Sequence, residues 1–266
     1  MLYPTELRTR PASLYHRPAA TASRRAVLML AGALLGGMGT RAAADEAVRV
    51  ERLARADAWV LADGRTIRLA SVVVPDLPVE LPARALALVA PLAEGRRLRL
   101  AGGERADRYG RMLGTLVDAA GQDPRLLLLR AGLAVVRCGD EPEAAVRVLL
   151  AAERDGRSSG RGIWGELDRA QATPVTVARR IGRFALVEGV AVAVKTSWDA
   201  SYLDFGPDWR TDFGIRILKA DLRRFVAAGL DPTTLTGRKL QVRGWPFQAT
   251  GPMLELRDPL ELQPLP

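Results

Sequence analysis

The chain has 266 residues, a length that predicts one large domain or two small ones. Charged residues make up 26% of it and apolar residues 48%, which is typical of a globular protein and excludes a disordered chain or a multi-span membrane protein. The single cysteine excludes an intrachain disulfide framework and a thiolate metal cluster. The single histidine, His16, lies near the N-terminus. A chain that loses its N-terminus therefore has no histidine for nucleophilic catalysis or for metal binding.

The first 44 residues have the pattern of a cleavable export signal. A basic segment precedes an apolar stretch at residues 26–39, which is too short to span a bilayer. Ala42, Ala43 and Ala44 then form an A-x-A cleavage pattern. Residues 23–28, SRRAVL, resemble a twin-arginine signal, and an ordinary secretory signal that contains two arginines is the alternative. We expect cleavage after Ala44, a periplasmic or extracellular location and no membrane span in the mature protein.

The net charge of +9 and the isoelectric point near 10.6 do not by themselves indicate nucleic-acid binding. Without residues 1–44 the chain keeps 33 bases and 29 acids, so its net charge falls to +4. Of the 39 bases 36 are arginine, a bias that reflects genomic base composition as much as phosphate recognition.

Residues 45–169 show the pattern of a small barrel that carries helices. Asp63-Gly64 separates two short apolar strands and predicts a hairpin with a type I′ turn. Proline, aspartate and glycine residues at the expected ends predict where the helices begin and end. In chain order we expect strands at 59–62 and 65–69, a helix at 81–93, strands at 96–101 and 111–118, and helices at 125–131 and 141–154.

Residues 170–182 lack a clear period and predict a linker, and residues 183–266 form a second strand-rich unit. Its expected elements are strands at 185–194, 201–205 and 213–218, a helix at 222–228, and strands at 239–243 and 253–256. Three strands, a helix and two strands is the order of an OB-fold. The fold class is therefore predicted as mainly β with helices (α+β), with two OB-type barrels. The aromatic residues of this unit, such as Trp198 and Phe213, predict core packing, with base stacking as the alternative.

Four segments of the first unit carry a further signal. They are DGRTIRL at residues 63–69 followed by Pro75, DRYGRML at 107–113, LLLLRAGLA at 126–134, and Ala152-Glu153 with RGIW at 161–164. Together these segments resemble the staphylococcal-nuclease-like (thermonuclease) family. Their order and spacing match the family over about half of the mature chain. The resemblance implies a five-stranded OB-type barrel with helices and Ca²⁺-dependent hydrolysis of DNA and RNA phosphodiesters.

The same resemblance implies roles for individual residues. Arg68 and Arg111 match the two catalytic arginines, whose guanidinium groups fork onto phosphate oxygens. Asp57 matches the first metal-binding aspartate, and Asp76 falls at the general base, where the family has glutamate. Val73 stands where the family has a second metal-binding aspartate. The resemblance also implies that Arg108 and Tyr109 bind substrate. The alternative for Arg108 is a solvated charge in a turn, and the alternative for Tyr109 is buried packing.

The departures at Val73 and Asp76 leave two functions open. A site with one carboxylate fewer binds Ca²⁺ less tightly unless Asp107 or Glu104 replaces the missing ligand. Residues 71–74, SVVV, are also simply an apolar run that continues a strand. The alternative to a nuclease is a catalytically silent nuclease-like OB protein that binds an oligonucleotide, a glycan or a protein partner in the cell envelope. In that protein Arg68 and Arg111 are structural ion-pair partners or a phosphate-binding remnant.

Two further expectations follow from the sequence. Cys138 is predicted to be a small buried hydrophobe, although a lone cysteine in an oxidising compartment can also form an intermolecular bridge. A monomer is the default, because no helical heptads or interface stripes are present.

Overall fold

The computed structural model describes residues 46–76, 79–107, 109–166 and 174–266. The predicted export signal and most of the predicted linker lie outside these ranges. In the part of the chain that is described, no helix is both long and apolar enough to cross a membrane.

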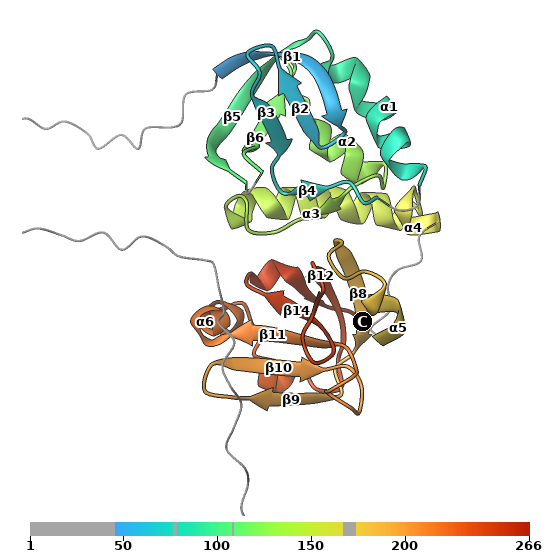
Figure 1. The fold of residues 1–266 in the computed structure, drawn as a ribbon, viewed down its shortest axis with the longest axis vertical. Coiled ribbons are helices and arrows are strands. Elements are labelled where there is room, and N and C mark those ends of the chain that lie inside the picture. Colours follow the sequence, from blue (N-terminus) through green and yellow to red (C-terminus); the bar gives the residue numbers. More distant parts are fainter. Residues whose placement is uncertain (1–45, 77–78, 108, 167–173) are drawn as a thin grey trace, which may run out of the picture. The chain divides into compact units, whose positions relative to one another are not determined.

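Residues 46–117 contain five strands that close into a barrel, which confirms the first predicted barrel (Figure 1). Around the barrel the strands run in the order β1 (Glu46–Arg55), β2 (Ala58–Leu61), β3 (Thr66–Leu69), β6 (Met112–Val117) and β5 (Arg97–Ala106). β3 and β6 pair in parallel, and the other neighbours are antiparallel. Trp59, Ile67 and Leu116 are fully buried in the barrel core. β1 is an element that the sequence reasoning missed.

The predicted hairpin between β2 and β3 is present, but its turn is not of type I′. That turn needs positive φ at both central residues, and Asp63 does not have it, whereas Gly64 has a φ of 87°. The Asp63 carboxylate instead accepts a hydrogen bond from the Arg65 backbone N–H at 3.0 Å. The aspartate thus closes the turn through its side chain, so the type I′ prediction is wrong.

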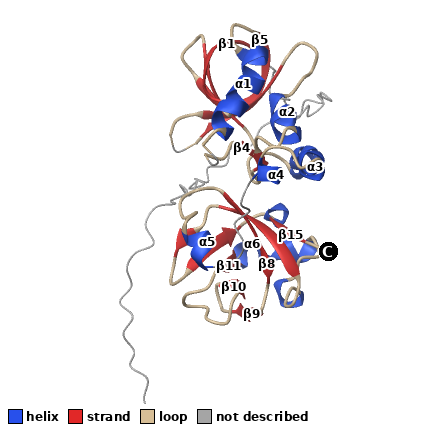
Figure 2. Ribbon diagram, turned by 90° about the vertical axis from the view of Figure 1, so that its right-hand side faces the viewer, coloured by secondary structure: helices blue, strands red, loops and turns tan. Residues whose placement is uncertain are grey.

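Three helices cover the barrel and its far end. α1 (Leu81–Ala93) buries Leu81, Ala85 and Val89, and Figure 2 shows it in front of the barrel strands. α2 (Pro124–Arg130) is capped at its N-terminus by Asp123, whose side chain accepts the Arg125 N–H at 2.9 Å. α3 (Glu143–Ser158) packs against α2, and α4 (Ile163–Glu166) follows it.

The family-like segments around Gly132 and Gly162 meet in space. The Ile163 N–H donates to the Gly132 carbonyl oxygen at 2.9 Å. A Cβ on Gly132 would lie 2.0 Å from the Arg161 carbonyl oxygen, and a Cβ on Gly162 would lie 2.3 Å from the Gly132 carbonyl oxygen. Both glycines also have positive φ. These motif residues therefore fix a close backbone approach between the end of α2 and the segment before α4.

Val73 does not continue the strand before it, so that prediction is wrong. β3 ends at Leu69, and Ser71 has a φ of 59°, which breaks the extended chain. Val73 lies in a separate short strand, β4 (Val72–Val73), which pairs antiparallel with β7 (Val135–Val136).

The C-terminal unit holds two sheets. The first has the order β13 (Phe247–Gln248), β14 (Pro252–Leu256), β11 (Gly214–Leu218), β10 (Ala200–Asp204) and β9 (Ala193–Thr196). The second has the order β15 (Leu262–Pro264), β12 (Lys239–Gly244) and β8 (Ala185–Val190). The strand predicted at 185–194 is thus divided between β8 and β9. The pairings are those of separate sheets, and a second barrel stays a prediction.

The remaining elements of this unit support its own core. α6 (Lys219–Ala227) buries Phe225, and the short 3₁₀ helices η1 (Pro232–Thr234) and η2 (Pro259–Glu261) flank β12 and β15 in the chain. α5 (Pro174–Ala178) lies in the predicted linker, yet Val177 is buried in this core. Phe213 is buried as core packing predicts, whereas the Trp198 side chain is 85% exposed.

Candidate functional site

Four of the predicted site residues lie near one another at one end of the first barrel. Asp57 is in the turn between β1 and β2, Arg68 is on β3, Asp76 follows β4, and Arg111 comes directly before β6. Arg55 contacts both Asp57 and Asp76, and the charges of Asp57 and Arg111 act on Arg68. This end of the barrel, defined by the four residues, is called the barrel mouth below.

Arg68 is held inside the protein by an acid that the sequence reasoning did not single out. It is 5% exposed, and its Nη2 atom lies 3.4 Å from Oδ2 of Asp140. Asp140 also accepts hydrogen bonds from the Ser71 N–H and the Arg137 guanidinium. Burial lowers the pKa of Arg68, as does the charge of Arg137, and Asp140 and Asp57 offset this only in part. Among the described residues, Nη1 of Arg68 has no hydrogen-bond partner.

Arg111 is paired with Asp107. Its Nε and Nη2 atoms lie 2.9 and 2.7 Å from Oδ2 of Asp107, whose other oxygen accepts the Tyr109 and Arg111 N–H groups. Burial raises the pKa of Asp107, but these hydrogen bonds outweigh burial and the pKa is lowered overall. Tyr109 is 67% exposed, and its ring centroid lies 5.3 Å from Cζ of Arg111. Arg108 lies outside the described residues.

Arg55 forms ion pairs with two carboxylates. The resemblance assigns the first, Asp57, to metal binding and the second, Asp76, to the general base. The Nε of Arg55 donates to Asp57 at 3.0 Å, its Nη1 to Asp76 at 3.1 Å, and its Nη2 to the Val74 carbonyl oxygen at 3.1 Å. The second oxygen of Asp57 accepts the Val74 N–H at 3.2 Å. Burial lowers the pKa of Arg55, but Asp57 and Asp76 outweigh burial and raise it overall.

These residues do not fit a calcium ion. Calcium takes six to eight oxygen ligands, of which carboxylates supply the charge. Here a guanidinium binds the carboxylates of Asp57 and Asp76, Val73 offers no side-chain oxygen, and Asp107 is paired with Arg111. Glu104 is exposed on β5. In the described ranges no three or more His, Cys, Asp or Glu residues are grouped to hold a metal.

Three residues of the barrel mouth were missed by sequence reasoning. Asp140 is 72 residues from Arg68, and no motif or spacing connects the two. Arg137 also reaches the ring of Trp245, with Cζ 5.6 Å from the centroid. Arg55 carried one weak signal, since it stands two residues before Asp57 where the family's acidic context is reduced.

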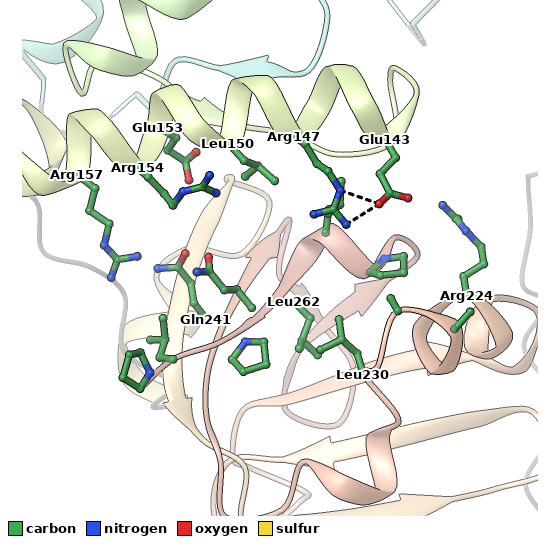
Figure 3. Close-up of a pocket in the computed structure, with 18 residues that line it drawn as sticks. Glu143, Arg147, Leu150, Glu153, Arg154, Arg157, Arg224, Leu230, Gln241 and Leu262 are labelled. Carbon is green, nitrogen blue, oxygen red and sulfur yellow. Dashed lines mark hydrogen bonds and ion pairs between the residues drawn. The ribbon is translucent and has the colours of Figure 1, made fainter.

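A pocket of about 910 Å³ lies elsewhere, between α3 and the C-terminal unit (Figure 3). Arginines on its rim include Arg147, Arg154 and Arg224, and Arg147 is paired with Glu143. None of the predicted site residues lines this pocket, so the pocket is separate from the barrel mouth.

Comparison with known proteins gives a match only within the first unit. Residues 84–166 match the family model described as staphylococcal nuclease homologue. The matched region runs from α1 to α4 and includes Arg111, whereas Asp57, Arg68 and Asp76 precede it. No curated protein matches the chain. The first unit is therefore a staphylococcal-nuclease-like domain with a closed five-stranded barrel.

Proposed function

We propose that this staphylococcal-nuclease-like protein is exported and binds single-stranded nucleic acid at the barrel mouth without Ca²⁺-dependent cleavage. Export rests on the basic, apolar and A-x-A pattern of residues 1–44. Binding rests on two arginines stacked on aromatic rings beside Arg68. The absence of metal-dependent cleavage rests on Arg55, which engages both candidate acids.

The barrel mouth combines guanidinium groups with accessible rings. The cluster holds four arginines, Arg55, Arg68, Arg111 and Arg137, and four carboxylates, Asp57, Asp76, Asp107 and Asp140, so its formal charges balance. Arg111 stacks on Tyr109, and Arg137 stacks on Trp245, which is 43% exposed. Cations that accompany stacking rings are typical of surfaces that bind single-stranded nucleic acid, because every base has a π face and every linkage a phosphate.

Hydrolysis through Asp76 is disfavoured by its contacts. A general base must be within hydrogen-bond reach of the water whose proton it takes. Asp76 instead accepts a hydrogen bond from Arg55 at one of its carboxylate oxygens. Ca²⁺-dependent phosphodiester hydrolysis is the alternative function, and it requires Arg55 to leave both acids.

The binding test uses residues 45–266 and a fluorescent single-stranded oligonucleotide, with affinity followed by anisotropy at increasing salt. Tyr109→Ala should weaken binding about 5- to 150-fold, because stacking is worth about 1–3 kcal/mol per base. Arg111→Ala should weaken binding and reduce its salt dependence. Arg147→Ala removes a paired arginine of α3 that is not at the barrel mouth, and it should leave binding unchanged.

The cleavage test incubates the same oligonucleotide as DNA and as RNA at high protein concentration, with Ca²⁺ or with chelator. We expect no difference between the two conditions. Chelator-sensitive cleavage that Arg68→Ala abolishes would overturn the proposal in favour of the nuclease. The absence of both cleavage and binding would leave a glycan or protein partner.

A further inference from the structure

We propose that Arg55 is a built-in counter-cation that occupies the position of a metal ion between Asp57 and Asp76. This deepens the proposed function, on which it rests only for the lack of Ca²⁺-dependent cleavage. It concerns what holds the two acids together, so it is tested by protein stability and cation binding and not by oligonucleotide binding.

The contacts of Arg55 are those of a cation in an all-oxygen site. Three of its nitrogens reach three different oxygens at 3.0–3.1 Å: one from Asp57, one from Asp76 and the Val74 carbonyl. Carboxylates and backbone carbonyls are the ligands that hard divalent cations take. A guanidinium presents five N–H donors in a fixed plane, so one side chain satisfies all three oxygens without further ligands.

The need for a cation here comes from Asp57. This carboxylate is 7% exposed, and its second oxygen is already bound to the Val74 N–H. A carboxylate that is buried without a counter-charge is costly. The Arg55 side chain is 42% exposed, so it reaches from the surface to the buried acid and also to Asp76, which is 57% exposed. Arg55 therefore links a buried and an exposed acid, as a bound ion would.

The valine at position 73 explains why one arginine can replace a divalent cation between Asp57 and Asp76. A divalent cation with only two carboxylates and one carbonyl lacks half of the ligands that calcium takes. Val73 adds no oxygen, and it lines a small pocket of about 120 Å³ together with Arg55, Val74 and Asp76. With valine at position 73 the site has one carboxylate fewer to neutralise. The charge of Arg55 then serves for the two acids that are left, and no divalent ion is needed.

The experiment measures the melting temperature and Tb³⁺ luminescence during a Ca²⁺ titration of residues 45–266. The unaltered protein and Val73→Asp should show no Ca²⁺-dependent stabilisation, because Arg55 still holds the acids. Arg55→Ala should lower the melting temperature. Arg55→Ala combined with Val73→Asp should regain stability with Ca²⁺ and bind it at least about tenfold more tightly than Val73→Asp alone, since ligand charge sets Ca²⁺ affinity.

The control is Arg65→Ala. Arg65 also lies between two acids, Glu46 at the start of β1 and Asp63 in the turn between β2 and β3, and both are about half exposed. Its loss should not create Ca²⁺-dependent stabilisation. Arg55→Lys, which keeps the charge without the fork, should recover part of the stability and stay indifferent to Ca²⁺.

Two results would overturn the proposal. One is a folded double variant that Ca²⁺ does not stabilise, and the other is Val73→Asp binding Ca²⁺ as tightly as the double variant. If the double variant does not fold, Arg55→Ala and Arg55→Lys decide the question. A melting temperature of Arg55→Lys above that of Arg55→Ala supports the counter-cation, and equal melting temperatures refute it.

Discussion

Replacing Arg125 with methionine should lower the free energy of unfolding by about 3–5 kcal/mol, the cost of breaking a buried ion pair by removing one partner. Arg125 is 6% exposed. It donates to Asp123 at 2.7 Å, to Glu141 at 2.7 Å and to the Ala70 carbonyl oxygen at 3.1 Å. Burial lowers the pKa of Arg125, but Asp123 and Glu141 outweigh burial and raise it overall. Methionine fills similar space and leaves all three acceptors without this donor.

The loss is measured by urea unfolding, followed by tryptophan fluorescence and circular dichroism. Arg147→Met is the matched control, because Arg147 and Glu143 form an exposed pair one helical turn apart, with side chains 62% and 65% exposed. Such pairs contribute about 0.3–0.5 kcal/mol. A loss below about 1 kcal/mol for Arg125→Met, or equal losses for the two variants, would refute the role given to burial.

The other predictions concern backbone space, pH and thiol reactivity. Gly132→Ala should destabilise the protein by about 3 kcal/mol or more, because its Cβ would lie 2.0 Å from the Arg161 carbonyl oxygen at a φ of +66°. Gly160→Ala, with a φ of +62° and open space, should cost only about 1–2 kcal/mol. Burial raises the pKa of Glu261 from 4.5 to about 7, against hydrogen bonds that lower it. The neutral carboxyl is thus favoured in the fold, and up to about 3 kcal/mol of stability present below pH 4.5 should be lost as the pH rises through 7. Burial raises the pKa of the Cys138 thiol to about 12, so maleimide should label it on the order of a hundredfold more slowly in the folded protein than in urea.

Each of these predictions has a result that contradicts it. Equal losses for the two glycine variants in urea unfolding would mean that the clash at Gly132 relaxes. A melting temperature that depends on pH equally in the parent and in Glu261→Gln would exclude Glu261 as the titrating group. Labelling of Cys138 at the same rate with and without urea would show that the thiol is accessible.

Sequence reasoning predicted most of the helices and strands, although not β1, and it predicted the fold of the first domain. α1 was predicted with the bounds that the structure gives, because Pro82 suits a first helical turn and Gly95 suits a stop. The four family-like segments predicted the barrel with its helices through their resemblance, and the structure shows that two of them meet at Gly132 and Gly162 with no space for a Cβ. Such signals are carried by neighbouring residues and can be read without coordinates.

The pairing of the charges at the barrel mouth could not be predicted from the sequence and was found only in the folded structure. Arg68 was predicted from resemblance, but its partner Asp140 lies 72 residues away in the chain. A bulge in β1 between Leu53 and Arg55 shifts the strand register just before Arg55 reaches Asp57 and Asp76. An ion pair depends on distances of about 3–4 Å between side chains, and no local period or cap encodes which distant residues the fold brings that close.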